Sequence, residues 1–162
     1  NLLVRDIEHE VVPAALDANI GLLPWSPLGG GWLSGKYKRD QMPTGATRLG
    51  EDPKRGMEAY EKRNGKSITW DVIGAVEDIA KARNVSMAQV ALAWVAAQPA
   101  VTSVILGART TDQLKDNLGA AELTLSADEI ATLSAASKPE MADYPYGTGG
   151  IDQRHRKIGG GR

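Results

Sequence analysis

The sequence has 162 residues, of which 42% are hydrophobic and 24% charged, a composition typical of globular proteins rather than disordered or fibrous ones. The formal net charge of −1 gives no electrostatic reason to expect nucleic acid or an anionic membrane as a partner. Cysteine is absent, which excludes disulfides and thiolate chemistry, and no apolar run approaches the roughly 20 residues that span a bilayer. We therefore expect a cytoplasmic protein.

The first residues read as part of a larger fold. Leu2 to Val4 is apolar and predicts the end of a short buried strand. We interpret the N-terminus as a cut end, because domains rarely begin inside a buried strand. Residues 6–19 carry apolar side chains at helical spacing, with acidic residues near the start, which predicts a helix that ends at Asn19 and Gly21.

Residues 20–25 form a short, continuous apolar run, which is typical of a strand buried on both faces. Pro24 would be awkward in the middle of a strand but is tolerated at its end. From Pro27 to about Lys66 the periodicity is lost and glycine is frequent, which predicts a long loop of the functional or mobile kind.

Helical periodicity returns at Ile68 and is interrupted at Asn84. Residues 86–89 have the pattern of a capping box that starts a second helix, which Pro99 closes. Residues 101–106 predict another short buried strand. A helix follows over 110–121, residues 126–129 predict a cap for one more helix through Ser134, and 138–162 are predicted to be an irregular tail.

This alternation of short apolar runs with helices predicts the α/β class, with parallel strands and helices packed outside them. Only three strands are expected, and three parallel strands have open edges and cannot close a barrel. We therefore expect the chain to be a fragment, with the rest of the fold elsewhere.

Candidate ligand contacts gather at the ends of the predicted strands, where parallel α/β proteins collect their ligands. After the strand 20–25, the Trp25 indole could lie against a planar ring, the Ser26 hydroxyl and glycine amides could approach a phosphate, and Lys36 supplies positive charge. The same pattern is equally compatible with a core tryptophan, a helix cap and a flexible glycine hinge.

After the strand 101–106, Gly107 would let a ligand approach the backbone, and Arg109 stands where a helix begins, a favourable place for a phosphate. Gln113, Asp116 and Asn117 would share a helix face with the donors and acceptors that a purine edge needs. The alternative, which the pattern alone favours, is a capping box of Thr110 and Gln113 beside ordinary solvated side chains.

Together the two segments resemble the aldo-keto reductase family. The Trp25-Ser26-Pro27-Leu28 sequence with its glycine run and 34–37 is similar to the loop after the seventh strand of the family's barrel. Gly107 to Arg109, with Gln113, Leu114, Asp116 and Asn117, is similar to the segment after the eighth strand. The resemblance extends to about Ser137, with 1–3 and the acidic 6–10 similar to the sixth strand and its helix.

The resemblance implies a (β/α)8 barrel that binds NADP(H) across its C-terminal face and reduces aldehydes or ketones without a metal. This chain would be the C-terminal half of such a barrel over 1–137, followed by the irregular tail 138–162, with the N-terminal half of the barrel absent. That half and a small carbonyl compound would be its partners, with no nucleic acid and no membrane.

The resemblance also implies a set of cofactor-binding residues. Trp25 would stack on the nicotinamide, Arg109 would meet the 2′-phosphate, and Asp116 stands where relatives more commonly have Glu. Gln113, Asp116 and Asn117 would surround the adenine, and Arg48 would be a further phosphate-side contact. The predicted pyrophosphate residues are Ser26, Leu28, Gly29 and Lys36, and the full set also includes Pro27 and Gly107.

No catalytic or metal-binding residue is assigned. The family's proton-donating Tyr, with its supporting Lys, Asp and usually His, comes from early strands that would precede Asn1. None of the four tyrosines occupies such a position, and neither His9 nor His155 has a metal or base partner in sequence; these tyrosines are Tyr37, Tyr60, Tyr144 and Tyr146. In relatives the tail shapes the substrate pocket, so residues 144–151 are expected to do so here.

Three functional hypotheses remain open. The first is that the chain grips NADPH for an oxidoreductase that passes hydride to an aldehyde or ketone. The second is a regulatory NADPH-binding module like potassium-channel beta subunits, which share the fold and the Trp-Ser-Pro-Leu sequence. The third is a fragment that is inactive on its own, because half a barrel exposes strand edges and apolar surface.

Overall fold

The computed structural model describes residues 1–140, 142, 144–147 and 149–150 of the chain. Over these residues the structure is helical. The elements, in chain order, are η1 (Asp6–Glu8), α1 (Val11–Asp17), η2 (Gly29–Ser34), α2 (Arg48–Glu51), η3 (Gly56–Glu58), α3 (Tyr60–Asn64), α4 (Ser67–Arg83), α5 (Met87–Ala96), α6 (Thr111–Leu118), η4 (Gly119–Glu122) and α7 (Ala127–Ala136).

The prediction of parallel strands belonging to half of a (β/α)8 barrel is wrong for this structure, in which the described residues form no strand. The two predicted strand segments do run side by side, but they share only two isolated parallel bridges, Leu22 with Val101 and Trp25 with Ile105. Pro24 lies between these bridges and has no N–H to donate, although its carbonyl accepts from the Ile105 N–H at 3.0 Å. The pairing therefore does not extend into a ladder.

The predicted burial of these segments is also wrong. Ile20, Leu23 and Ile105 are 59%, 58% and 52% exposed. The third predicted strand, 2–4, is instead a turn in which the Asn1 side-chain oxygen accepts hydrogen bonds from the N–H groups of Leu3 and Val4, at 2.9 and 3.1 Å. A two-segment pairing without a third strand has too few neighbours to form a stable sheet.

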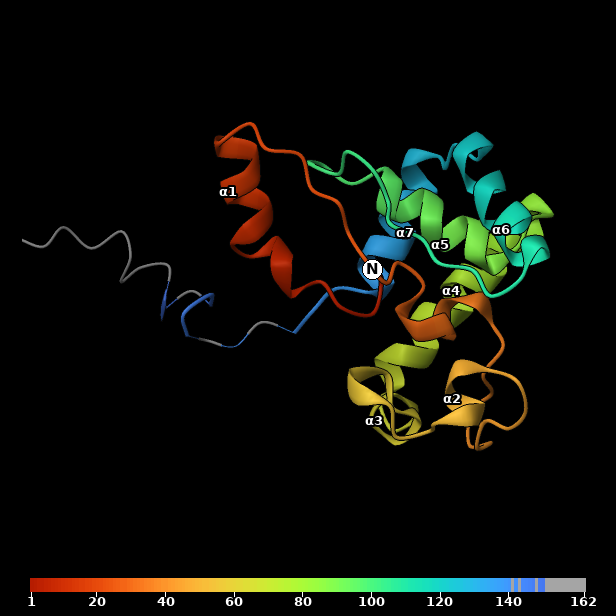
Figure 1. Cartoon of the computed structure of the whole chain (residues 1–162). Coiled ribbons are helices and arrows are strands. Elements are labelled where there is room, and N and C mark those ends of the chain that lie inside the picture. Colours follow the sequence, from red (N-terminus) through yellow and green to blue (C-terminus); the bar gives the residue numbers. More distant parts are fainter. Residues whose placement is uncertain (141, 143, 148, 151–162) are drawn as a thin grey trace, which may run out of the picture.

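The main core lies among α4, α5 and α7, which pack against one another (Figure 1). Helix α5 is at its centre: every residue from Val90 to Val95 is buried. Val72 and Val76 of α4 and Leu133 of α7 are almost completely buried against it. Asn84 ends α4 in the left-handed conformation (φ 52°), and the capping boxes predicted at 86–89 and 126–129 are confirmed.

The segment predicted as a long loop, 27–66, is in fact folded around a second core. Its short helices bring Trp32, Tyr37, Leu49 and Tyr60 together with Ile73 of α4, all five buried. The Trp32 indole stacks on Tyr60, with ring centroids 5.5 Å apart, and its N–H donates to the Glu58 carbonyl at 3.0 Å. Because these aromatic residues follow no helical or strand period, the sequence pattern did not reveal their packing.

Two predicted helices are shorter than expected. The helix predicted over 6–19 is divided into η1 and α1, because Pro13, at the third position of α1, cannot donate a hydrogen bond to the preceding turn. The helix predicted over 110–121 ends at Leu118 and continues as η4.

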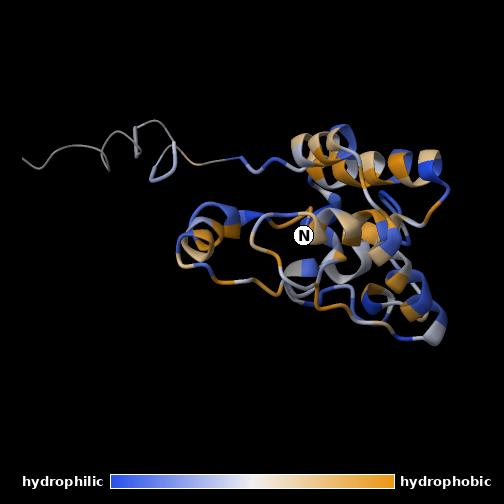
Figure 2. Ribbon diagram, turned by 90° about the horizontal axis from the view of Figure 1, so that it is seen from above, coloured by the Kyte–Doolittle hydropathy of each residue, from blue (hydrophilic) through white to orange (hydrophobic). Residues whose placement is uncertain are grey.

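Helix α1 stands apart from the helical core, joined to it by extended chain (Figure 1). Of its residues only Ala15 is buried, while Val11 and Leu16 are 50% and 53% exposed. Figure 2 shows apolar residues on α1 and along the extended segment that follows it. The N-terminal part of the chain is therefore much less buried than the helices of the core.

Candidate functional site

The two predicted ligand clusters meet along one groove of about 360 Å³. One wall comes from the segment after Trp25 and the other from the segment that leads into α6. All the predicted site residues except Trp25 and Gly29 line this groove, namely Ser26, Pro27, Leu28, Lys36, Arg48, Gly107, Arg109, Gln113, Asp116 and Asn117. The backbone bridge of Trp25 to Ile105 explains why the two segments end side by side.

The first wall, residues 26–48, is fixed to the aromatic core behind it. The Tyr37 hydroxyl donates to the Gly30 carbonyl at 3.2 Å and accepts from the Leu49 N–H at 3.3 Å. Gly30 and Gly31 have positive φ values of 66° and 99°. A side chain at Gly31 would also collide with the aliphatic part of Lys36, so glycine lets this lysine fold over the wall.

Lys36 is the cation of this wall. Its ammonium lies 5.8 Å from the centre of the Tyr37 ring. The Lys36 side chain is exposed as a whole, yet partial removal of its ammonium from water lowers its pKa, and the positive charge of Arg109 lowers it further. Arg48 lines the same groove. Three cationic side chains thus share one groove, an arrangement that an anion would relieve.

Arg109 is the cation of the second wall, and it is already engaged. Its Nη2 donates to the Glu51 Oε1 at 2.6 Å, and this ion pair raises the pKa of Arg109. The Arg109 N–H donates to the Gln113 side-chain oxygen at 2.9 Å, while the Thr110 hydroxyl accepts from the Gln113 N–H at 3.2 Å. Thr110 therefore caps α6, but Gln113 bonds to Arg109 instead of completing the predicted capping box.

Two residues predicted to contact an adenine have structural partners. Asp116 accepts a hydrogen bond from the Ser86 hydroxyl, the N-cap of α5, at 2.8 Å, and its carbonyl accepts from the Gln89 amide at 2.9 Å. Asn117 is buried, and its amide donates to the Gly107 carbonyl at 3.5 Å. Both residues hold the α6 wall against its surroundings while lining the groove.

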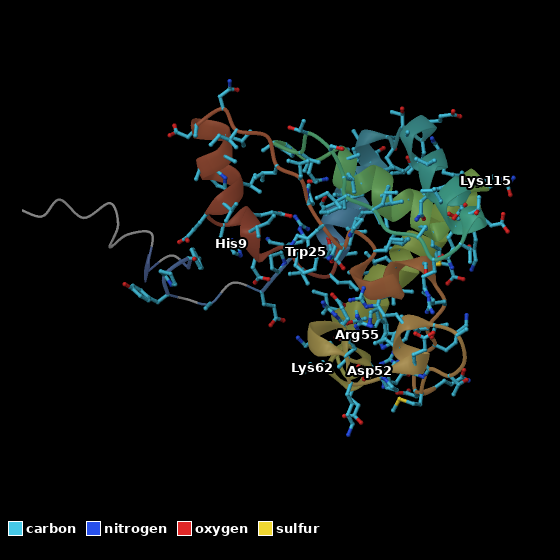
Figure 3. All side chains as sticks on the ribbon, viewed as in Figure 1. His9, Trp25, Asp52, Arg55, Lys62 and Lys115 are labelled. Carbon is cyan, nitrogen blue, oxygen red and sulfur yellow. The ribbon has the colours of Figure 1, made fainter. Side chains whose placement is uncertain are left out.

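Trp25 and Gly29 lie outside the groove lining. Trp25 is 70% exposed and lies near the middle of the molecule, between α1 and the helical core (Figure 3). Its chain neighbour Ser26 lines the groove, but Trp25 itself does not. Gly29 is buried, and a side chain there would press on Leu3. The alternative in which Trp25 is a core residue is therefore wrong.

Two residues at the site lie outside both segments that the sequence indicated. Ala88, in the first turn of α5, lines the groove, and Glu51, at the end of α2, pairs with Arg109. Nothing in the sequence marked Glu51, because it lies 58 residues from its partner in a stretch without periodicity. Ala88 follows the Ser86 cap, whose bond to Asp116 joins α5 to the groove, but no spacing pattern relates these helices.

In the described part of the chain, no group of three or more His, Asp or Glu side chains is arranged to hold a metal ion. No helix there is long and apolar enough to cross a membrane. His9 stacks on Tyr146, with ring centroids 4.9 Å apart. His155 and Ile151 lie outside the described residues, so the predicted role of the tail stays a prediction.

Comparison with known proteins connects the chain to one family. A sequence model of the aldo/keto reductase family matches residues 1–138. An uncharacterised oxidoreductase of Bacillus subtilis, YrpG, is 34% identical over 134 residues, which cover 83% of this chain and 37% of that protein. A probable voltage-gated potassium channel subunit beta of Arabidopsis thaliana is 34% identical over 127 residues, covering 76% of this chain and 37% of that protein.

A third relative has a named reaction. The versiconal hemiacetal acetate reductase of Aspergillus parasiticus is 30% identical over 145 residues, covering 86% of this chain and 39% of that protein. The chain thus spans 37% to 39% of the length of these three relatives. The match to the family model, over residues 1–138, includes the helical core and both walls of the groove.

Proposed function

Because the chain belongs to the aldo/keto reductase family, we propose that its groove holds NADP(H) for an oxidoreductase that reduces an aldehyde or ketone. The supporting observation is the gathering of Lys36, Arg48 and Arg109 along one groove, where Arg109 contributes to the lowered pKa of Lys36. A dinucleotide with several phosphates would neutralise this concentration of positive charge. A cytoplasmic location stays a prediction from the sequence.

The charges and hydrogen-bonding groups of the groove residues complement those of a dinucleotide. Lys36 and Arg48 would face the pyrophosphate with Ser26 and the glycine amides, and Arg109 would meet a 2′-phosphate. Gln113 offers a donor and an acceptor toward the base, and Asp116 and Asn117 hold the wall on which it lies. The volume, about 360 Å³, is within the usual range of ligand sites.

In this proposal the chain positions the cofactor and supplies no proton. NADPH would provide the hydride when bound, and Trp25, an exposed side chain that precedes the groove residue Ser26, would lie against its nicotinamide ring. The sequence holds no residue that the family resemblance assigns to proton transfer. In this proposal the proton for reduction of a carbonyl compound would come from residues that this chain does not supply.

Titration with NADPH and NADH tests the proposal. We expect NADPH to quench the emission of the exposed Trp25, and Arg109→Ala to weaken NADPH binding about tenfold or more, through loss of a charge-assisted contact. Lys115→Ala is the matched control, because Lys115 is an exposed cation of α6 that does not line the groove. Absence of NADPH binding, or equal losses for both variants, would defeat the proposal.

The second candidate function is a regulatory dinucleotide-binding module. It is favoured by the likeness to the probable potassium channel beta subunit of Arabidopsis thaliana. Both functions need the same groove, so the binding titration does not separate them. Turnover of carbonyl compounds by the whole protein would favour the reductase, whereas NADPH binding without turnover, together with co-purification of a membrane partner, would favour the module.

A further inference from the structure

The Glu51–Arg109 ion pair places a carboxylate on the cation that the proposed function gives to the 2′-phosphate. The Glu51 Oε1 and the Arg109 Nη2 are 2.6 Å apart. The two side chains are 52% and 53% exposed, so both charged groups remain accessible to a ligand. Arg109 lines the groove, whereas Glu51 does not line it and contacts Arg109 from the end of α2.

The segment that carries Glu51 positions it toward Arg109. Glu51 is the last residue of α2, whose N-cap Thr47 accepts a hydrogen bond from the Gly50 N–H at 2.9 Å. Leu49, from the same turn, is completely buried in the aromatic core. Because the buried Leu49 fixes α2 and Glu51 lies on its exposed side, the helix holds the Glu51 carboxylate next to Arg109.

A carboxylate in this position treats the two nicotinamide dinucleotides differently. A 2′-phosphate carries negative charge, so it must displace Glu51 from Arg109 or bind beside a like charge. A ribose 2′-hydroxyl can instead donate a hydrogen bond to the carboxylate, which is the usual role of an acidic residue at an NAD ribose. The Glu51–Arg109 pair therefore disfavours the 2′-phosphate of NADPH and accommodates the 2′-hydroxyl of NADH.

We propose that Glu51 is a specificity-determining residue that competes with the 2′-phosphate for Arg109 and so weakens discrimination in favour of NADPH over NADH. This inference rests on the proposed function of the groove. It assigns Glu51 a role in choosing between ligands, while Arg109 remains the group that contacts the phosphate. The competition is electrostatic, so it weakens as the ionic strength rises.

Dissociation constants of NADPH and NADH for the wild type and Glu51→Gln test this proposal. We expect Glu51→Gln to tighten NADPH binding about threefold to tenfold at low salt, because a like charge and an ion-pair competitor are removed. NADH binding should stay unchanged or weaken. The gain for NADPH should shrink in an Arg109→Ala background and at high salt.

Glu77→Gln is the matched control. Glu77 forms an exposed ion pair of similar length, 2.8 Å, with Lys81 on α4, outside the groove, and its substitution should leave both dissociation constants unchanged. Equal changes for the two dinucleotides, or an undiminished NADPH gain without Arg109, would overturn the assignment of Glu51 and leave the proposed function standing. A wild type that binds neither dinucleotide would defeat the proposed function and this inference with it.

Discussion

The two walls of the groove are held in different ways. The wall of residues 26–48 rests on buried aromatic rings, with Trp32 and Leu49 completely inaccessible to solvent. The α6 wall is held by polar contacts, chiefly Asp116 with Ser86 and Asn117 with Gly107. Helix α6 buries only Asn117, and its apolar residues Leu114 and Leu118 are 41% and 56% exposed.

One wall of the groove is thus held by buried packing, and the other is held by hydrogen bonds. Removing a packed ring leaves a cavity, whereas removing a polar contact near the surface exchanges one hydrogen bond for another with water. We therefore expect substitutions in the aromatic wall to affect folding most. Substitutions in the α6 wall should have smaller effects on stability.

The largest effect is expected for Trp32→Ala, in the aromatic wall. Trp32 is completely buried and stacks on Tyr60, so its truncation should lower the free energy of unfolding by about 3–5 kcal/mol. Urea unfolding would measure the change. Trp25→Ala is the control, because an indole that is 70% exposed should change stability by no more than about 0.5 kcal/mol. Similar losses for both variants would contradict the aromatic anchoring of this wall.

A smaller effect is expected for Asp116→Ala, in the α6 wall. The half-buried carboxylate accepts from the Ser86 hydroxyl at 2.8 Å, and losing this charged hydrogen bond should cost about 1–2 kcal/mol of unfolding free energy. Asp78→Ala, at an exposed position of α4, should leave stability nearly unchanged. Thermal unfolding of both variants measures this difference. An Asp116→Ala variant as stable as the wild type would show that the hydrogen bond from Ser86 does not stabilise the α6 wall.

The cap of α6 is expected to contribute less. Thr110→Ala removes the hydroxyl that accepts from the Gln113 N–H at 3.2 Å, and should cost about 1 kcal/mol. Thr111→Ala, one residue later and exposed, keeps this cap and should be neutral or slightly stabilising. Chemical denaturation distinguishes the two; equal effects would mean that the α6 wall does not depend on its cap.

The smallest effect concerns the charge of Lys36. Burial and the charge of Arg109 lower the pKa of Lys36, so its ammonium loses its proton at a lower pH than an ordinary lysine. Loss of a positive charge weakens anion binding, so NADPH affinity should fall about threefold as the pH rises through this lowered pKa. Burial raises the pKa of the neighbouring Tyr37, which shifts the titration of its hydroxyl toward higher pH.

Lys36→Arg serves as the control for the pH dependence. Arginine keeps its charge throughout the same interval, so the NADPH dissociation constant of this variant should stay nearly constant. A pH dependence identical to that of the wild type would assign the titration to another group. Dissociation constants measured from neutral pH to about pH 10 decide between these results.

Local chemistry made part of this structure predictable. The capping boxes at 86–89 and 126–129 follow from residue types at fixed short spacings, and both were predicted correctly, as was the interruption of the helix at Asn84. The likeness of 25–37 and 107–117 to one family also anticipated that both segments would line one groove. Binding of a dinucleotide by these residues stays a prediction.

Tertiary structure decided what depends on distant neighbours. Apolar runs at 20–25 and 101–106 satisfied a strand pattern, but a stable sheet needs further strands, and here these two segments meet in two isolated bridges on either side of Pro24. The aromatic wall joins residues without a common period, and the Glu51–Arg109 pair joins residues 58 positions apart. The sequence by itself determined where the capped helices α5 and α7 begin and where α4 ends, because caps act within one turn. Only folding decided which side chains meet across the groove, because those contacts depend on the whole packed chain.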